Sequence, residues 1–201
     1  MNIAIIGSGP SAFYAAQSFS NDEKVNVDII EKFFAPYGLV RYGVAPDHQK
    51  TKNIIKLFNR VLEKDNVNFF GNINVSKDIS LDFLSENYDA VLLATGASED
   101  KLLNIEGEEK VGVYGSAKFV GWYNGNPDHS NLEPNLNSKN AIIIGNGNVA
   151  LDCARILAKT KDELHGSDIS QKNLNLLSNS KIDKIYIVGR RGPIDAKFTI
   201  S

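Results

Sequence analysis

The sequence predicts an α/β protein with two dinucleotide-binding units, because two apolar, strand-like runs each lead into a glycine-rich turn and then a helical pattern. The first run, residues 3–6, is followed by GSGPSA at 7–12, and the second, residues 141–144, by GNGNVA at 145–150. Between them, strand-like and helical segments follow one another in a β-α-β order. That order favours a doubly wound, mostly parallel sheet.

In the first unit, short apolar or alternating runs predict strands and a helical period predicts helices. We expect a helix at 11–20 and strands at 2–7, 25–30, 68–70, 73–75 and 90–94, the last one fully buried. Residues 34–46 hold two prolines and two glycines and predict an ordered, irregular loop. Asp47 is placed to cap the next helix. The apolar positions of that helix define one buried face: Ile54, Ile55, Phe58, Val61 and Leu62.

The pattern breaks into charged and glycine-containing sequence from residue 98 to about 112, which indicates a crossing between domains. We therefore expect a first domain at 1–106 and a second at 107–201. In the second, 124–140 predicts a surface loop, 170–177 a helix and 184–188 a strand. A further helix starts near Asn148, with four apolar residues on one side: Val149, Cys153, Ile156 and Leu157.

Composition sets limits on the class of protein. With 201 residues, 42% of them hydrophobic, and a net charge of −2, the chain resembles an ordinary globular protein and gives no argument for nucleic-acid binding or membrane insertion. The first strand begins at Asn2 and leaves no room for a signal peptide, so we expect a cytoplasmic location. The single cysteine, Cys153, excludes an internal disulfide or a Cys-x-x-Cys pair, and no residue cluster has metal-ligand spacing.

The first glycine-rich turn has the residues that a bound pyrophosphate requires. Gly7 permits the tight turn, Gly9 lets the backbone approach the phosphates, and Ala12 takes the place of the third glycine. Phosphates would then lie on amides at a helix N-terminus. Glu31, at the end of the next strand, can accept hydrogen bonds from ribose hydroxyls, which favours FAD in this unit. The alternative is a tight turn that holds no ligand.

The second turn ends with the opposite charge. Its glycines and Asn148 can donate to phosphates, and the strand at 184–188 leads to Arg190 and Arg191. Arginines at that position suit a 2′-phosphate, so we expect NADPH rather than NADH. The alternative is a pair of solvated surface charges, but the position directly after the strand end and Gly189 favours the 2′-phosphate role. FAD in the first unit and NADPH in the second imply electron transfer between them.

Two further polar residues have both a functional and a structural interpretation. Asp152 lies one turn into the second unit's helix, where a carboxylate also favours the helix dipole. His48, beside Asp47, can be only part of a helix start. The sequence does not decide between these roles.

Four segments closely resemble adrenodoxin reductase-type ferredoxin–NADP reductases. They are PYGLVRYGVAPDH at 36–48, FVGWYNG at 119–125, GNGNVALD at 145–152 and VGRRGP at 188–193. The resemblance covers the whole chain. It implies two Rossmann-like domains in a glutathione-reductase-like arrangement, with FAD in 1–106 and NADP in 107–201. It also implies an enzyme that passes electrons from NADPH through the flavin to a ferredoxin-type iron–sulfur protein.

The resemblance also implies roles for individual residues. FAD would lie on the first turn, on Glu31, and on Gly38, Leu39 and Val75. NADPH would lie on Asn146, Gly147, Asn148 and Val149, with its 2′-phosphate on the arginine pair. The residues thus expected to bind cofactors are Gly7, Gly9, Ser11, Ala12, Glu31, Gly38, Leu39, Val75, Asn146, Gly147, Asn148, Val149, Arg190 and Arg191. His48 and Asp152 match positions near the flavin and nicotinamide, where they would relay a proton or position groups.

One departure from this family bears on activity. Its members are longer and return to the FAD domain with a C-terminal segment, so we expect this chain to be C-terminally truncated, with both domains incomplete. Two alternatives stay open: a non-catalytic nucleotide-binding fragment, and a flavin module like the small subunit of glutamate synthase. The WYNG segment at 122–125 weighs against the second.

Overall fold

The structure, a computed structural model, describes residues 1–97, 99–196 and 198–199. It divides into two compact units. Unit 1 comprises Met1–Val44 and Gln49–Ser98, and unit 2 comprises Ala45–His48 and Glu99–Ser201. The four residues 45–48 therefore belong to unit 2, although unit 1 precedes and follows them in the chain. The contact boundary falls at 98/99, while the division into cofactor domains at 106/107 stays a prediction.

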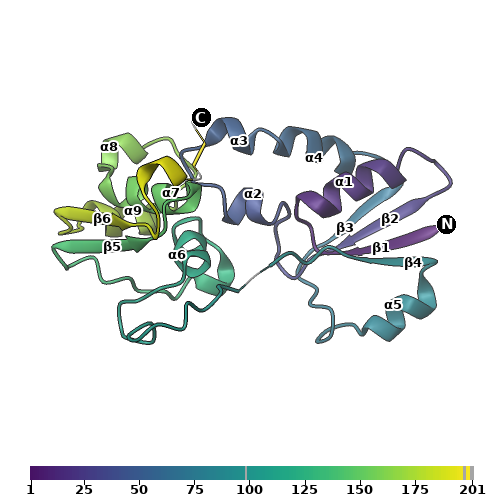
Figure 1. The fold of residues 1–201 in the computed structure, drawn as a ribbon. Helices are drawn as coiled ribbons and strands as arrows, with labels where there is room; N and C mark the ends of the chain where they lie inside the picture. The colour runs from purple at the N-terminus through teal and green to yellow at the C-terminus, as the bar shows by residue number, and fades with distance from the viewer. Residues whose placement is uncertain (98, 197, 200–201) are drawn as a thin grey trace. The chain divides into compact units, whose positions relative to one another are not determined.

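Unit 1 is an α/β layer structure around one parallel sheet with the strand order β3-β2-β1-β4 (Figure 1). Its elements are β1 (Asn2–Ile6), α1 (Pro10–Phe19), β2 (Asn26–Ile30), α2 (Leu39–Tyr42), α3 (Gln49–Lys52), α4 (Ile55–Leu62), β3 (Val67–Phe70), α5 (Leu81–Asn87) and β4 (Ala90–Leu93). Strand β1 pairs in parallel with both β2 and β4, and Ile6 lies opposite Ile30 and Leu93. The carboxyl ends of these three strands therefore meet at one edge.

Helices cover both faces of the β1–β2 region, which explains why these strands are apolar at nearly every position. Alternate strand residues, such as Ile3 and Ile5, pack with α1 and α4 through Phe13 and Phe58. The residues between them, including Ala4, pack with α5 in a second cluster. Figure 1 shows α1 and α5 on opposite sides of the sheet.

Three expectations for unit 1 were wrong. Strand β4 is only half-buried, with Leu93 64% exposed, because it lies at the edge of the sheet and not at its centre. The segment 73–75 forms no strand; Val75 makes a single bridge to Ile79. The loop at 34–46 contains the short helix α2, in which Tyr42 N donates to Gly38 O.

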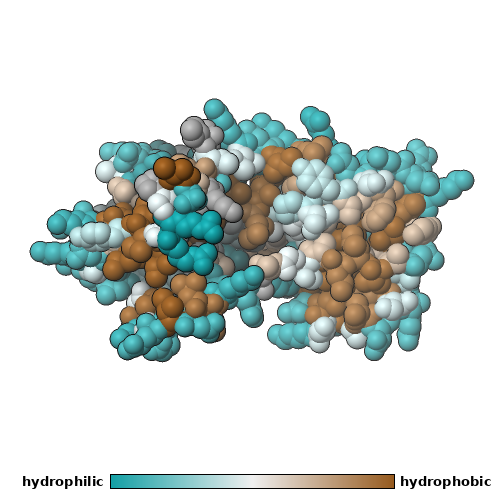
Figure 2. Space-filling view, viewed as in Figure 1, coloured by the Kyte–Doolittle hydropathy of each residue, from teal (hydrophilic) through white to brown (hydrophobic). Residues whose placement is uncertain are grey.

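Unit 2 is built on two parallel strands with helices packed against them. Its elements are α6 (Ser116–Tyr123), η1 (Pro127–His129), β5 (Asn140–Ile144), α7 (Asn148–Ala158), α8 (Lys161–Leu164), α9 (Gln171–Ser178), β6 (Lys184–Val188) and η2 (Pro193–Asp195). The core joins Trp122 and Tyr123 of α6 to Ile156 of α7 and to α9. Apolar residues gather over β5 and β6 (Figure 2), where Ile142 and Tyr186 are exposed.

The helix at 148–158, the helix near 170–177 and the strand at 184–188 agree with the sequence prediction. Val149, however, is 48% exposed and does not share the buried side of α7 with Cys153 and Ile156. The reason is its position in the first turn, beside the glycine-rich loop. In the part of the chain that the structure describes, no helix is long and apolar enough to cross a membrane.

Candidate functional site

The first glycine-rich turn closes tightly onto the end of the sheet. Gly7 has a φ of +102°, and its amide donates to Ile30 O at 2.8 Å. A Cβ at this position would lie 2.4 Å from Ala94 O. Both the dihedral angle and the close approach of the backbone therefore require glycine.

Helix α1 begins with amides that no side chain caps. Gly9 is its N-cap residue, and the first intrahelical bond runs from Phe13 N to Gly9 O at 3.1 Å. No side-chain cap is present, so the amides of Ser11 and Ala12 are left for a ligand. A Cβ on Gly9 would meet nothing within 4 Å. This open backbone at a helix N-terminus fits a phosphate group.

Glu31 is buried beside this turn, with 8% of its surface exposed. Its Oε2 accepts hydrogen bonds from the Ser8 amide at 3.0 Å and the Ser8 hydroxyl at 2.6 Å. Oε1 accepts from the amide of Phe33 at 3.0 Å. The carboxylate is thus fixed at the end of β2, directly beside Ser8 of the glycine-rich turn.

The Tyr-Gly segment at 37–38 is seated directly on the glycine-rich turn. Tyr37 N donates to Ser8 O at 3.0 Å, and a Cβ on Gly38 would lie 2.8 Å from Gly9 Cα. Both residues have a positive φ, 91° at Tyr37 and 48° at Gly38. Leu39 then starts α2 and is 62% exposed, so its side chain is available to a ligand.

Val75 lies elsewhere in unit 1. It is partly buried and packs with the α5-side cluster that contains Ala4, Ile6 and Leu84. Its predicted contact with FAD rests on the resemblance alone.

Unit 2 repeats the backbone geometry of the first turn. The Gly145 amide donates to Val188 O at 2.8 Å, the counterpart of the Gly7–Ile30 bond. Gly147 is the N-cap of α7, with Leu151 N bonded to Gly147 O and no side-chain cap. A Cβ on Gly147 would also meet nothing within 4 Å. The two units therefore each present an open helix N-terminus at the end of a parallel strand pair.

The asparagines of the second turn have different surroundings. A Cβ on Gly189 would lie 2.8 Å from Asn146 Nδ2, so this side chain covers the residue that follows β6. The Asn148 side chain pairs with Thr199: its Oδ1 accepts from Thr199 N at 2.9 Å, and its Nδ2 donates to Thr199 Oγ1 at 3.2 Å. The Asn148 side chain is thus already partnered, and the phosphate contact predicted for this residue falls to its backbone amide, the first after Gly147, or to the second hydrogen of Nδ2.

Arg190 and Arg191 follow β6 and are both exposed. Among the described residues, neither guanidinium group has an ion-pair partner. Because Ile144 lies opposite Val188 in the parallel pair, the arginines leave the sheet at the edge where the second turn begins. The segment that carries the two arginines thus leaves the sheet at the edge where α7 begins, as the segment with Glu31 leaves it where α1 begins.

His48 and Asp152 are brought together within unit 2. His48 Nε2 lies 4.0 Å from Asp152 Oδ1, which is an electrostatic contact longer than a hydrogen bond. Arg155 donates to both Asp152 and Asp47, and Lys159 donates to Asp47. The sequence did not indicate these partners of Asp47, which was expected only to cap a helix.

Three buried polar atoms of unit 2 have no hydrogen-bond partner among the residues described: Trp122 Nε1, Tyr123 Oη and Asn124 Oδ1. They belong to the WYNG segment that the resemblance singled out, although no role was predicted for them. Nearby, burial and the negative charge of Asp152 raise the pKa of the Cys153 thiol to about 11. Cys153 is therefore a protonated core residue, as expected for an isolated cysteine in a helix.

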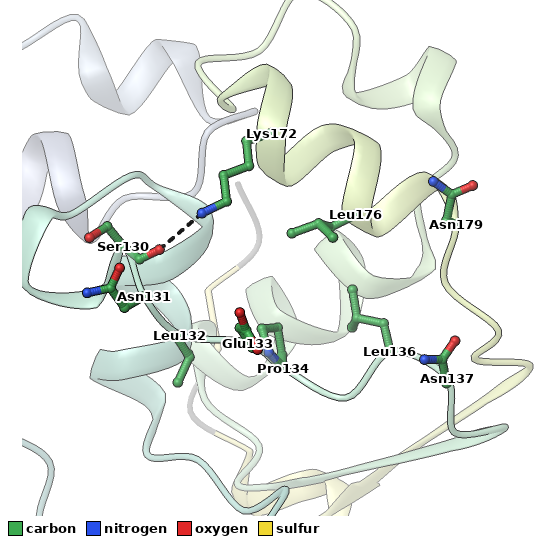
Figure 3. A pocket seen from close by; sticks show the side chains of 10 residues that line it. All are labelled: Ser130, Asn131, Leu132, Glu133, Pro134, Leu136, Asn137, Lys172, Leu176 and Asn179. Carbon is green, nitrogen blue, oxygen red and sulfur yellow. Dashed lines mark hydrogen bonds between the residues drawn. The ribbon is translucent and has the colours of Figure 1, made fainter.

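A cavity of about 630 Å³ lies in unit 2, and no residue of either glycine-rich turn lines it. Figure 3 shows its lining, which comes from the loop at 130–137 and from Lys172, Leu176 and Asn179 at α9 and its end. Lys172 Nζ donates to Ser130 O at 3.4 Å. The cavity contains none of the predicted site residues. Among the described residues, no group of His, Cys, Asp and Glu side chains could hold a metal ion.

The fold and the two turns define a protein with two dinucleotide-binding units, one ending in a buried carboxylate and one in exposed arginines. The model of the pyridine nucleotide-disulphide oxidoreductase family matches residues 1–186. The chain belongs to this family.

Similar proteins are considerably longer. NADPH:adrenodoxin oxidoreductase of Bos taurus is 45% identical over 199 residues, which are 98% of this chain and 40% of that protein. NADPH-ferredoxin reductase FprA of Mycobacterium tuberculosis is 47% identical over 203 residues, and the match covers 98% of this chain and 44% of that protein. The solved structure of FprA with NADPH superposes with a TM-score of 0.93 at 46% identity and covers 98% of this chain and 45% of that one. The chain thus spans less than half the length of these relatives.

Proposed function

We propose that this chain is the nucleotide-binding part of an NADPH-dependent flavoprotein reductase that delivers electrons to a ferredoxin-type iron–sulfur protein. The observation that carries the proposal is the repeated turn with opposite charges: Glu31 follows one strand pair and Arg190 the other. The similarity to NADPH:adrenodoxin oxidoreductase and FprA supports it.

Each unit has the groups that its cofactor needs. In unit 1, the amides of Ser11 and Ala12 would hold the FAD pyrophosphate and Glu31 a ribose. Gly38 packs against the backbone of Gly9, which leaves no room for a side chain at position 38, while Leu39 offers an apolar contact. A bound FAD would supply the redox chemistry that links two-electron hydride transfer from NADPH to single-electron transfer to the iron–sulfur acceptor.

In unit 2, the amides that follow Gly147 would hold the NADPH pyrophosphate. Arg190 and Arg191 would form charge-assisted hydrogen bonds with the 2′-phosphate, which NADH lacks. Neither arginine forms an ion pair within the described chain, so a phosphate could bind without displacing a carboxylate, which supports this assignment. Asn146 and Val149 stand at the same turn and would complete the site.

His48 and Asp152 would lie near the reacting groups and hold or move a proton between His48 Nε2 and Asp152 Oδ1. Their 4.0 Å separation is short enough to close to a hydrogen bond on ligand binding. If they act in this way, His48→Gln and Asp152→Asn should each slow flavin reduction by NADPH, and unchanged rates would exclude the role.

The decisive experiment is to purify the chain, record its visible spectrum, add NADPH and then add a ferredoxin. A yellow protein that NADPH bleaches, and that then reduces the iron–sulfur protein, supports the reductase. A colourless protein that binds only NADP⁺ supports the alternative of a non-catalytic nucleotide-binding fragment.

The partner and the compartment are parts of the same proposal. A ferredoxin is the proposed acceptor because the names of the relatives specify ferredoxin or adrenodoxin as theirs. We propose a cytoplasmic location, although the name of the Bos taurus relative specifies mitochondria. Cell fractionation with an antibody to the chain tests this directly.

A further inference from the structure

The guanidinium group of Arg155 joins two carboxylates that come from distant parts of the sequence. Its Nε and Nη2 donate to Asp47 Oδ2 and Oδ1, both at 2.9 Å, in a two-pronged pair. Its Nη1 donates to Asp152 Oδ1 at 2.7 Å. All three nitrogens are therefore engaged, and the planar group fixes the relative position of the two carboxylates.

Asp47 is the firmly held end of this bridge. Its side chain is 9% exposed, and Lys159 Nζ donates to its Oδ2 at 2.7 Å. Burial favours the neutral carboxyl, but the bonds from Arg155 and Lys159 outweigh it and hold the pKa of Asp47 well below its usual range. The segment is also held by Asp168 N, which donates to Pro46 O at 3.1 Å.

The same bridge determines where His48 lies relative to Asp152. His48 follows Asp47 directly, and its amide donates to Ala45 O at 3.0 Å, so a shift of the Asp47 backbone would also move His48. The Asp152 oxygen that accepts from Arg155 is the one that lies 4.0 Å from His48 Nε2. Arg155 thus controls both members of the His48–Asp152 pair without an ion pair to His48.

We propose that Arg155 is a positioning residue that aligns His48 and Asp152 for their part in flavin reduction, an inference that rests on the proposed function. A purely structural ion pair would stabilise unit 2 without a specific effect on Asp152. Lys159 provides the matched control, because it bonds to the same Asp47 carboxylate but is not bonded to Asp152.

The kinetic test measures the rate of flavin reduction at saturating NADPH in chain loaded with FAD. Arg155→Lys should lower this rate by about 10- to 100-fold, because a single ammonium cannot hold both carboxylates and a misplacement on the order of 1 Å costs up to that factor. Lys159→Met should lower it by less than about threefold. In the Asp152→Asn background, Arg155→Lys should lower the rate by a much smaller factor than it does in the wild-type chain.

Two results would overturn the proposal. In one, Arg155→Lys lowers the rate of flavin reduction no more than Lys159→Met does. In the other, Arg155→Lys lowers the rate by the same factor in the Asp152→Asn background as in the wild-type chain. A second readout needs neither cofactor nor turnover: hydrogen exchange of the His48 amide in the nucleotide-free chain. Arg155→Lys should raise the exchange rate of this amide at least about tenfold, and Lys159→Met should raise it by a smaller factor. Equal increases in the two variants would contradict the proposal. If the chain fails to reduce flavin, the proposed function fails, while exchange still decides whether Arg155 positions His48.

Discussion

Alanine substitutions at Gly7 and Gly9 should affect different properties of the protein, although the two glycines lie in one turn. Gly7 has a φ of +102°, and a Cβ there would lie 2.4 Å from the backbone oxygen of Ala94. Gly9 has a φ of −77°, which any residue adopts, and its Cβ would meet nothing. We expect Gly7→Ala to destabilise the fold and Gly9→Ala to weaken FAD binding.

The magnitudes follow from these two geometries. For Gly7→Ala, the strained dihedral angle costs about 1–3 kcal/mol, and forcing the backbone around Ala94 aside costs about 1–3 kcal/mol more. A total of about 2–6 kcal/mol lowers the melting temperature by roughly 5–20 °C for a chain of this size. Gly9→Ala should change the free energy of unfolding by at most about 1 kcal/mol, the cost of a poorer N-cap.

The assay combines thermal unfolding of the cofactor-free chain with titration of FAD. If a phosphate approaches the Gly9 backbone, the added methyl group removes one or two charge-assisted hydrogen bonds and weakens FAD binding about 10- to 100-fold. Wild-type affinity in Gly9→Ala would refute the phosphate position. Unchanged stability in Gly7→Ala would refute the close approach at Ala94.

The remaining predictions concern charge and protonation. Replacing Arg190 and Arg191 together with alanine should lower the preference for NADPH over NADH by about 100-fold, because contacts to the 2′-phosphate are lost. The preference is measured as the ratio of the two kcat/KM values. An unchanged ratio would mean that this phosphate binds elsewhere. The pKa of Asp47 is lower in the folded than in the unfolded chain, so its stabilisation is complete above about pH 4 and is lost as the pH falls through the folded value. Asp47→Asn should therefore cost about 2–4 kcal/mol at pH 7, measured by urea unfolding, and should flatten the acid-side decline in stability; an equally steep decline would contradict this. Because burial raises the pKa of Cys153 to about 11, iodoacetamide at pH 8 should alkylate it only after unfolding, and rapid alkylation of the native chain would contradict the burial.

The sequence predicted the elements whose signals are local. Strand β1 and helices α1 and α7 follow from glycine-rich turns and the patterns beside them, and strands β2 and β6 follow from short apolar or alternating runs. The two turns make the same backbone hydrogen bond, which fits two similar units. Helix α8 was not predicted, although it also has a local signal, because Thr160 and Glu163 form a capping box at its start.

Other features depend on partners far away in the chain and could not be predicted from periodicity. The exposure of Leu93 follows from the edge position of β4, which an apolar run does not reveal. The positive φ of Tyr37 depends on its seat against Ser8. The ion pairs of Asp47 join it to residues more than a hundred positions later, so no spacing rule indicates them.

The assignment of residues 45–48 to unit 2 has a practical consequence for dividing the protein. A piece that starts at residue 99 would contain Arg155 and Lys159 without Asp47, the carboxylate that both of them bind. Such a piece would leave Lys159 without this carboxylate and Arg155 with Asp152 alone, and it should be less stable than unit 2 in the whole chain. Separate production of unit 2 therefore calls for a grafted copy of the short 45–48 peptide, joined ahead of residue 99 by a flexible linker.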